Sequence, residues 1–220
     1  MNAAMPITII LLSCLVVPAQ AAENRDEMKE RIRHVSPDKK FAMRILHEEE
    51  HEPSEAIPSE EIHDIQLVTL PSKRVVAHLL REDDKGTNFE NVTLLWSSDS
   101  KRCAFYYQAP RMGYTMVYRL VAGKFVAANK PGDLKNKADR DAGEHGVKSE
   151  FIRPLRWSES GTLTLLQDTV YFYNDAESEW ELTAALDGKA SKVRVVSARL
   201  LSPEEAEKLQ EEAEKVTSHE

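Results

Sequence analysis

The sequence predicts a mainly β protein of three antiparallel units followed by a C-terminal α-helix. Three segments share one signature, a turn and then an apolar strand, and their turn serines, Ser36, Ser97 and Ser158, stand 61 residues apart. Equal spacing of one signature indicates an internal repeat. Residues 180–186 alternate apolar and polar side chains, as in a strand with one buried face. Ser202 begins a helix-start signature near the C-terminus.

Each unit opens with a turn built on serine. The three segments read VSPDKKFAMRIL from Val35, WSSDSKRCAFYY from Trp96 and WSESGTLTLLQ from Trp157. Serine and aspartate oxygens accept hydrogen bonds from nearby backbone N–H groups, which predicts a tight turn. The apolar run that follows each turn predicts a strand.

Further strands are expected after each of these. IQLVTLPSKRVVAHLL predicts two strands joined at Pro71, and YTMVYRLVAGKFVAA predicts two strands joined near Gly123. In the third unit the strands surround a turn at Gly188, while the polar stretch EEEHEPSEAIPSEE and residues 130–150 are expected to be long loops. The alternating residues of the third unit share one face: Trp180, Leu182, Ala184 and Leu186.

Helices are expected at both ends of the mature chain. Ser202 as N-cap and Glu205 form a capping box, with a proline at the first helical position. Near the N-terminus, residues 24–35 are expected to form a short helix with Met28 and Ile32 facing inward. The C-terminal helix carries a narrow apolar stripe that suits docking on a sheet: Ala206, Leu209, Ala213 and Val216.

The first 21 residues are predicted to be a signal peptide. The apolar run from Ile7 to Val17 is too short for a membrane span, and Ala19-Gln20-Ala21 suits cleavage. We therefore expect a periplasmic or secreted protein with no membrane span. In an alternative interpretation, Cys14 carries a lipid anchor. The expected organisation is a signal peptide at 1–21, a β-repeat domain at 22–201, and a C-terminal helix and tail at 202–220.

Charge and cysteine content narrow the function classes. The chain has 29 Lys+Arg against 37 Asp+Glu, a net charge of −8, so it lacks the basic footprint of a nucleic-acid-binding protein. After cleavage Cys103 is the only cysteine, and no intramolecular disulfide can form. Its apolar surroundings favour a buried residue over a nucleophile. Since no phosphate-binding loop or similar motif is present, no cofactor is predicted.

The repeated turn resembles the TolB-like β-propeller repeat, in which W-S-P-D-G-K precedes an apolar strand. The first copy keeps S-P-D from Ser36, the second keeps W-S at Trp96 with Asp99, and the third keeps W-S at Trp157 with Gly161. The resemblance implies a propeller-like fold that binds proteins or other ligands, and it implies no chemistry. Closed propellers use about 4 to 8 blades. Since three units are recognisable, either a fourth set of strands has diverged or the array is open.

The segment HEEEH matches H-E-x-x-H, the zinc-protease signature. In that alternative function, a zinc peptidase, His47 and His51 bind the metal and Glu48 is the general base. The motif requires a helix, whereas this segment continues the strand predicted after Ser36. Residues four apart in a strand are separated by about 13 Å, too far for two ligands of one ion. We therefore expect an acidic loop.

Four tyrosines are the predicted binding residues, because they surround the hairpin in FYYQAPRMGYTMVY and exposed tyrosines are typical of interfaces. They are Tyr106, Tyr107, Tyr114 and Tyr118. Together with the repeats, they favour a non-enzymatic binding or assembly module. Its expected partner is another protein or a component of the cell envelope.

Overall fold

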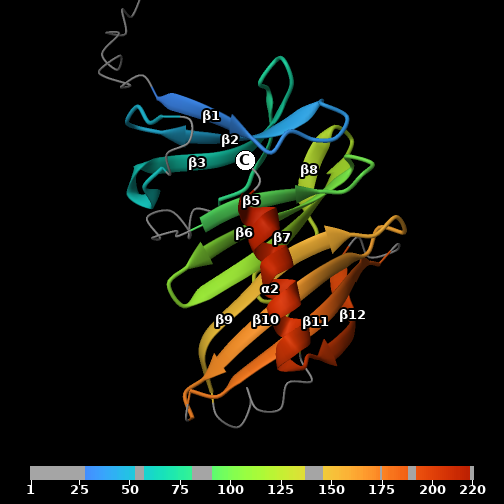
Figure 1. The fold of residues 1–220 in the computed structure, drawn as a ribbon. Coiled ribbons are helices and arrows are strands. Elements are labelled where there is room, and N and C mark those ends of the chain that lie inside the picture. The colour runs from blue at the N-terminus through green and yellow to red at the C-terminus, as the bar shows by residue number, and fades with distance from the viewer. Residues whose placement is uncertain are drawn as a thin grey trace, which may run out of the picture.

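Two β-sheets and one α-helix make up the residues that the computed structural model describes (Figure 1). These residues are 28–52, 57–80, 91–136, 146–173, 175–187 and 192–218. The prediction of a mainly β protein with a C-terminal helix is confirmed. The predicted signal peptide at 1–21, Cys14 and Gly188 lie outside the described residues.

The first sheet is a meander, in which strands adjacent in sequence pair antiparallel in the order β1-β2-β3-β4. The two strands predicted around Pro71 are confirmed as β3 and β4. The strands are β1 (Lys29–Arg33), β2 (Phe41–His47), β3 (Ile62–Thr69) and β4 (Val75–His78), and a short 3-10 helix, η1 (Ser59–Glu61), precedes β3.

The short N-terminal helix predicted at residues 24–35 is wrong over its described part. Lys29 pairs with His47 and Arg33 with Met43, so this stretch is the edge strand β1. Isolated short helices are marginal in water, whereas pairing with β2 gives these backbone groups partners. Tertiary pairing therefore overrides the local pattern.

The second sheet contains eight strands, with the order β12-β11-β10-β9-β7-β6-β5 and β8 paired to β7. Strands β5 to β8 form one antiparallel meander and β9 to β12 another. The two meanders join through a short parallel contact, in which Met112 and Gly113 of β7 pair with Glu150 and Phe151 of β9. The strands are β5 (Asn91–Trp96), β6 (Arg102–Ala109), β7 (Met112–Val121), β8 (Lys124–Ala127), β9 (Val147–Trp157), β10 (Leu163–Tyr171), β11 (Glu177–Leu186) and β12 (Val193–Leu200).

Strand β9 begins inside the stretch at residues 130–150 that the sequence predicts to be a loop. Residues 147–150 pair with β10, so the loop prediction is wrong there. β9 also contains Pro154, which cannot donate to a ladder. The register slips between Thr164 and Leu165 beside this proline, and such a bulge is where a strand tolerates proline.

Each of the three serine turns contains the same kind of internal hydrogen bond. In each turn the serine hydroxyl accepts the backbone N–H of the residue that begins or precedes the next strand, as expected from the sequence. The bonds run from Phe41 to Ser36 Oγ (3.0 Å), from Arg102 to Ser97 Oγ (3.1 Å) and from Thr162 to Ser158 Oγ (3.0 Å).

Neighbouring turns also contact one another through tryptophan. Trp96 Nε1 donates to the backbone oxygen of His34 at 2.6 Å, just before the first turn. Trp157 Nε1 donates to the backbone oxygen of Leu95 at 3.1 Å, just before the second. The turns therefore lie along one side of the molecule (Figure 1).

One residue in each turn has left-handed backbone geometry. Lys39, Ser100 and Gly161 have φ of 58°, 56° and 82°. A residue with a Cβ pays about 1–2 kcal/mol for this conformation, which glycine adopts freely. At Gly161 a Cβ would also clash with the guanidinium of Arg102.

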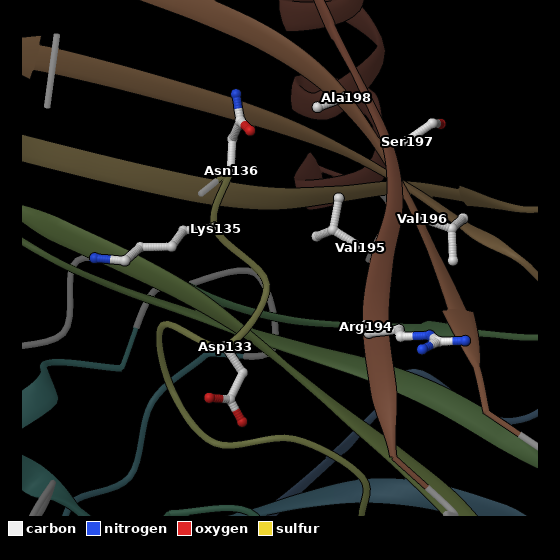
Figure 2. Close-up of a pocket in the computed structure, with 8 residues that line it drawn as sticks. All are labelled: Asp133, Lys135, Asn136, Arg194, Val195, Val196, Ser197 and Ala198. Carbon is white, nitrogen blue, oxygen red and sulfur yellow. The ribbon is translucent and has the colours of Figure 1, made fainter. Parts of the chain in front are cut away.

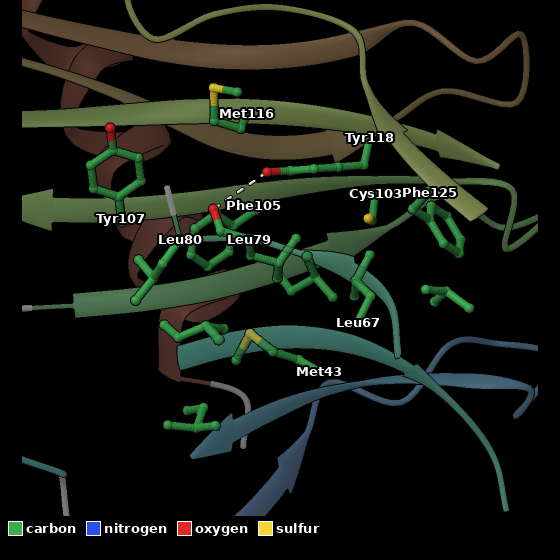
Figure 3. Packing of buried hydrophobic residues seen from close by; sticks show 14 residues of the cluster. Met43, Leu67, Leu79, Leu80, Cys103, Phe105, Tyr107, Met116, Tyr118 and Phe125 are labelled. Atoms are coloured by element: carbon green, nitrogen blue, oxygen red, sulfur yellow. Dashed lines mark hydrogen bonds between the residues drawn. The ribbon is translucent and has the colours of Figure 1, made fainter. Parts of the chain in front are cut away.

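An apolar core lies between the first sheet and the β5–β8 meander (Figure 3). Every second residue of β6, namely Cys103, Phe105 and Tyr107, belongs to it and is buried. The hydroxyl of Tyr118 donates to the backbone oxygen of Leu79 at 3.4 Å, which links the two sides. Cys103 is thus a buried apolar residue, as expected, and burial raises the pKa of its thiol.

A second apolar core lies on the opposite face of the same meander, against β9–β12. Ala104 of β6 and Val117 of β7 belong to it. Strand β11 supplies the residues predicted to share one face, which confirms that prediction: Leu182 and Ala184 within the core, and Trp180 and Leu186 packed against it. Strand β6 and the middle of β7 are therefore buried on both faces.

Helix α2 (Pro203–Ser218) covers the remaining face of the third meander (Figure 1). Leu155 of β9 and Leu166 of β10 meet its apolar stripe. Arg156 donates from Nη1 to both carboxylate oxygens of Glu212, at 2.9 and 2.7 Å. The predicted docking stripe is confirmed at Ala206, Leu209 and Ala213.

The predicted capping box of α2 is also confirmed. The backbone N–H of Ser202 donates to Glu205 Oε2 at 3.0 Å, and the N–H of Glu205 donates to Ser202 Oγ at 3.4 Å. Arg199 Nη1 donates to the same carboxylate at 2.6 Å. The Ser202 backbone bond, followed by the Arg199 bond, lowers the pKa of Glu205 to about 2.

We predict that Lys39→Gly stabilises the protein by roughly 0.5–1 kcal/mol, because glycine removes the cost of a positive φ but adds entropy to the unfolded chain. Urea unfolding measures the change. Ser100→Gly is the matched comparison, since its hydroxyl accepts the backbone N–H of Asp38 at 3.0 Å and glycine loses that bond. Equal stabilisation by both substitutions, or destabilisation by Lys39→Gly, would contradict this reading of the turns.

We also predict that Glu205 titrates with a midpoint near pH 2 in the folded protein. This pKa lies below the value of about 4.3 that glutamate has in the unfolded chain. The contribution of the Glu205 cap to the free energy of unfolding is therefore complete above about pH 4.3, and it is lost as the pH falls through the pKa of the folded protein. NMR titration of the carboxyl carbon measures the midpoint. Arg199→Ala should raise the midpoint of Glu205. An ordinary glutamate midpoint in the wild type would contradict the claim that the bonds from Ser202 and Arg199 lower this pKa.

Candidate binding site

The two histidines of the HEEEH segment lie closer together than the sequence predicts. His47 ends β2, and the chain then bends at residues 48–49 instead of continuing as a strand. The ring centroids of His47 and His51 are consequently 5.6 Å apart, so the expectation that a continuing strand keeps the two imidazoles apart is wrong. His47 Nδ1 lies 2.7 Å from the backbone oxygen of Glu49, and His51 Nε2 lies 2.6 Å from Glu61 Oε2.

The third residue of the zinc alternative is engaged elsewhere. Glu48 Oε1 lies 2.6 Å from Nε2 of His63 on β3. Across the ranges described above, no three His, Cys, Asp or Glu side chains are grouped so that they could hold a metal ion.

Three of the four predicted binding tyrosines are not on the surface. Tyr106, Tyr107 and Tyr118 are 0%, 6% and 5% exposed, so the premise that they form an exposed surface is wrong. They lie on strands whose two faces are both covered, where alternation cannot place a side chain outside. Tyr114 is half-buried, and a binding role for it stays a prediction.

A cavity of about 430 Å³ lies between β12 and the segment that follows β8, residues 128–136 (Figure 2). Val195 points from β12 into this gap. A second cavity of about 410 Å³ shares Asp133 with the first and extends to β7 and β8. We call the two cavities together the β12 cleft. Its basic residues are Arg119, Lys130, Lys135, Lys192 and Arg194.

Hydrogen bonds from two buried amide side chains hold the 128–136 segment in place. Asn129 Oδ1 accepts the backbone N–H of Val117 on β7 at 2.7 Å. At the other end of the segment, Gln167 Oε1 of β10 accepts the backbone N–H of Asn136 at 2.7 Å. The segment is thus tied to both meanders, so one wall of the β12 cleft is preformed.

The β12 cleft carries positive charge. Among the described residues, one carboxylate, Asp133, lines it together with the five basic residues, and it already accepts the backbone N–H of Lys130 at 2.8 Å. Arg194 is 70% exposed and reaches Asp187 only at 3.9 Å. Valine and alanine side chains, among them Val195 and Ala198, add apolar surface. This combination suits an anionic ligand with an apolar part.

Sequence reasoning missed this cleft. Lys130 and Lys135 fall in the stretch taken for a loop, and Arg194 falls in a predicted strand some 60 residues later. A weak signal is present in KVRVV at residues 192–196, where basic side chains alternate with valine in a mainly acidic chain. Only the fold brings the two segments together.

The chain matches no protein-family model, no curated protein and no solved structure. Over the described ranges, none of its helical structure has the length and apolarity that crossing a bilayer requires.

Proposed function

We propose that the protein is an exported, non-enzymatic binding or assembly module that takes an anionic ligand in the β12 cleft. The charge of this cleft carries the proposal, because five basic residues and one carboxylate of the described ranges line it in a chain of net charge −8. A basic cleft attracts anions, because opposite charges raise the local concentration of the ligand and favour its encounter with the site. Its apolar floor at Val195 and Ala198 adds contact area.

We further propose that the three meanders are units of an open, propeller-like array. Three observations support this proposal. Each meander has four strands paired antiparallel in order. The serine turns stand 61 residues apart and each contains the same kind of hydrogen bond, and tryptophan side chains connect neighbouring turns. In such an array the β12 cleft lies between the second and third units. Ligands of stacked β units commonly bind where units meet, since side chains from both converge there.

The two ends of the array support the open form. At one end α2 occupies the face that a following unit would cover. At the other end the outer face of the first sheet is polar: Arg44 Nε donates to Gln66 Oε1 at 3.0 Å, and Gln66 Nε2 donates to Asp64 Oδ2 at 2.7 Å. His78 Nδ1 lies 2.6 Å from the same Asp64 oxygen. Burying these groups against another unit costs free energy that apolar faces do not incur.

The decisive experiment compares two double variants with equal changes in charge. Lys135→Glu/Arg194→Glu alters the β12 cleft, whereas Lys39→Glu/Arg74→Glu alters exposed residues of the first sheet region. Labelled poly-L-glutamate at low ionic strength is the probe, followed by fluorescence anisotropy. We expect the cleft variant to bind at least about tenfold more weakly than the wild type and the control to change little.

Equal weakening in both variants, or no binding by the wild type, would overturn the proposal. The alternative class, a zinc peptidase using His47, Glu48 and His51, predicts a different result. It requires stoichiometric zinc in the purified protein and peptide hydrolysis that disappears in His47→Ala.

A further inference from the structure

We infer that the ligand of the β12 cleft is an extended acidic polypeptide segment that pairs with the edge of β12 that faces away from β11. This inference rests on the proposed function and adds the class of partner. β12 is the last strand of the eight-stranded sheet, and β11 is its sheet partner. An edge strand offers a row of backbone donors and acceptors to an added strand.

The direction of those backbone groups follows from two hydrogen bonds. The N–H of Val193 points off the sheet edge, because it donates to the backbone oxygen of Ala128 at 2.9 Å. The N–H of Leu201 points inward, because it donates to the backbone oxygen of Glu179 on β11 at 2.9 Å. Groups alternate along a strand, so the N–H and C=O groups of Val195 and Ala198 point off the edge.

A bulge separates those two outward positions. The register with β11 slips between Thr183 and Ala184, which leaves Val196 as the extra residue, and its side chain is 54% exposed. Bulges and charged residues on an edge strand discourage unwanted pairing with the strands of other chains. Arg194 beside this bulge disfavours basic or purely apolar strands, whereas an acidic strand compensates its charge.

The spacing of the basic groups favours a chain over a compact anion. In Figure 2, Lys135 extends from the 128–136 segment and Arg194 from β12, and the two side chains point away from each other on the outer sides of the gap. These charges flank the gap instead of meeting at one point. Alternate residues of an added strand point to opposite faces, so acidic residues would meet the basic groups while apolar ones meet Val195 and Ala198.

The test uses a short synthetic peptide that alternates glutamate and valine. A second peptide of the same sequence has methyl groups on alternate backbone nitrogens, which keeps its charge but blocks pairing along one edge. We expect the full-length protein to bind the first peptide at least about tenfold more tightly than the weaker-binding of the two methylated peptides, whose methyl groups face β12. Both registers of methylation are synthesised, because only one faces β12.

Ala198→Pro provides the matching change in the protein. Proline removes one outward N–H, and an edge strand tolerates it at such a position. We expect this variant to lose about tenfold in affinity for the unmethylated peptide while unfolding at the wild-type temperature. If the variant does not fold, the comparison of the two peptides still decides.

Equal binding of methylated and unmethylated peptides, combined with loss in Lys135→Glu/Arg194→Glu, would overturn strand pairing and leave the proposed function intact. Tighter or equal binding of free glutamate or inorganic phosphate would overturn it in favour of a small-anion site. Failure of both poly-L-glutamate and the peptide to bind would overturn the proposed function itself.

Discussion

The burial of β6 and the middle of β7 on both faces is the constraint on which the rest of the structure depends. Phe105 of β6 belongs to the core shared with the first sheet, and Ala104, its neighbour, belongs to the core shared with β9–β12. Each fully buried large apolar side chain contributes roughly 1.5–3 kcal/mol. The outer meanders meet the middle one through these cores, while the parallel contact between β7 and β9 covers only two residue pairs.

The binding cleft is a consequence of this packing. The second and third meanders share an apolar core. At the edge of that core the 128–136 segment and β12 are joined by the bond from Val193 to Ala128, and beyond it they diverge, so that the β12 cleft opens between them. Through Asn129 and Gln167, one wall is hydrogen-bonded to two different strands, β7 and β10. A ligand therefore meets a site whose geometry is set by the core, which reduces the ordering cost of binding.

Local turn chemistry was predictable from the sequence, whereas features made by distant segments were not. Ser36 and its two counterparts specify their turns with their own side chains, and Ser202 specifies the start of α2 in the same way. Strand β1 was mistaken for a helix because only pairing with β2 makes it a strand. The buried tyrosines were missed because RCAFYY was not recognised as a strand covered on both faces, which such a continuous apolar run indicates. The cleft joins segments that the sequence keeps apart.

Native-state hydrogen exchange across a urea series tests most directly whether the middle meander holds the structure together. The amides of β6 and β7 should exchange only through global unfolding and should show the highest opening free energy in the protein. Those of β1 and of the outer part of β12, which lie at sheet edges, should open at lower free energy. Opening of β6 and β7 at lower free energy than β2 and β3, or than β10 and β11, would contradict the account.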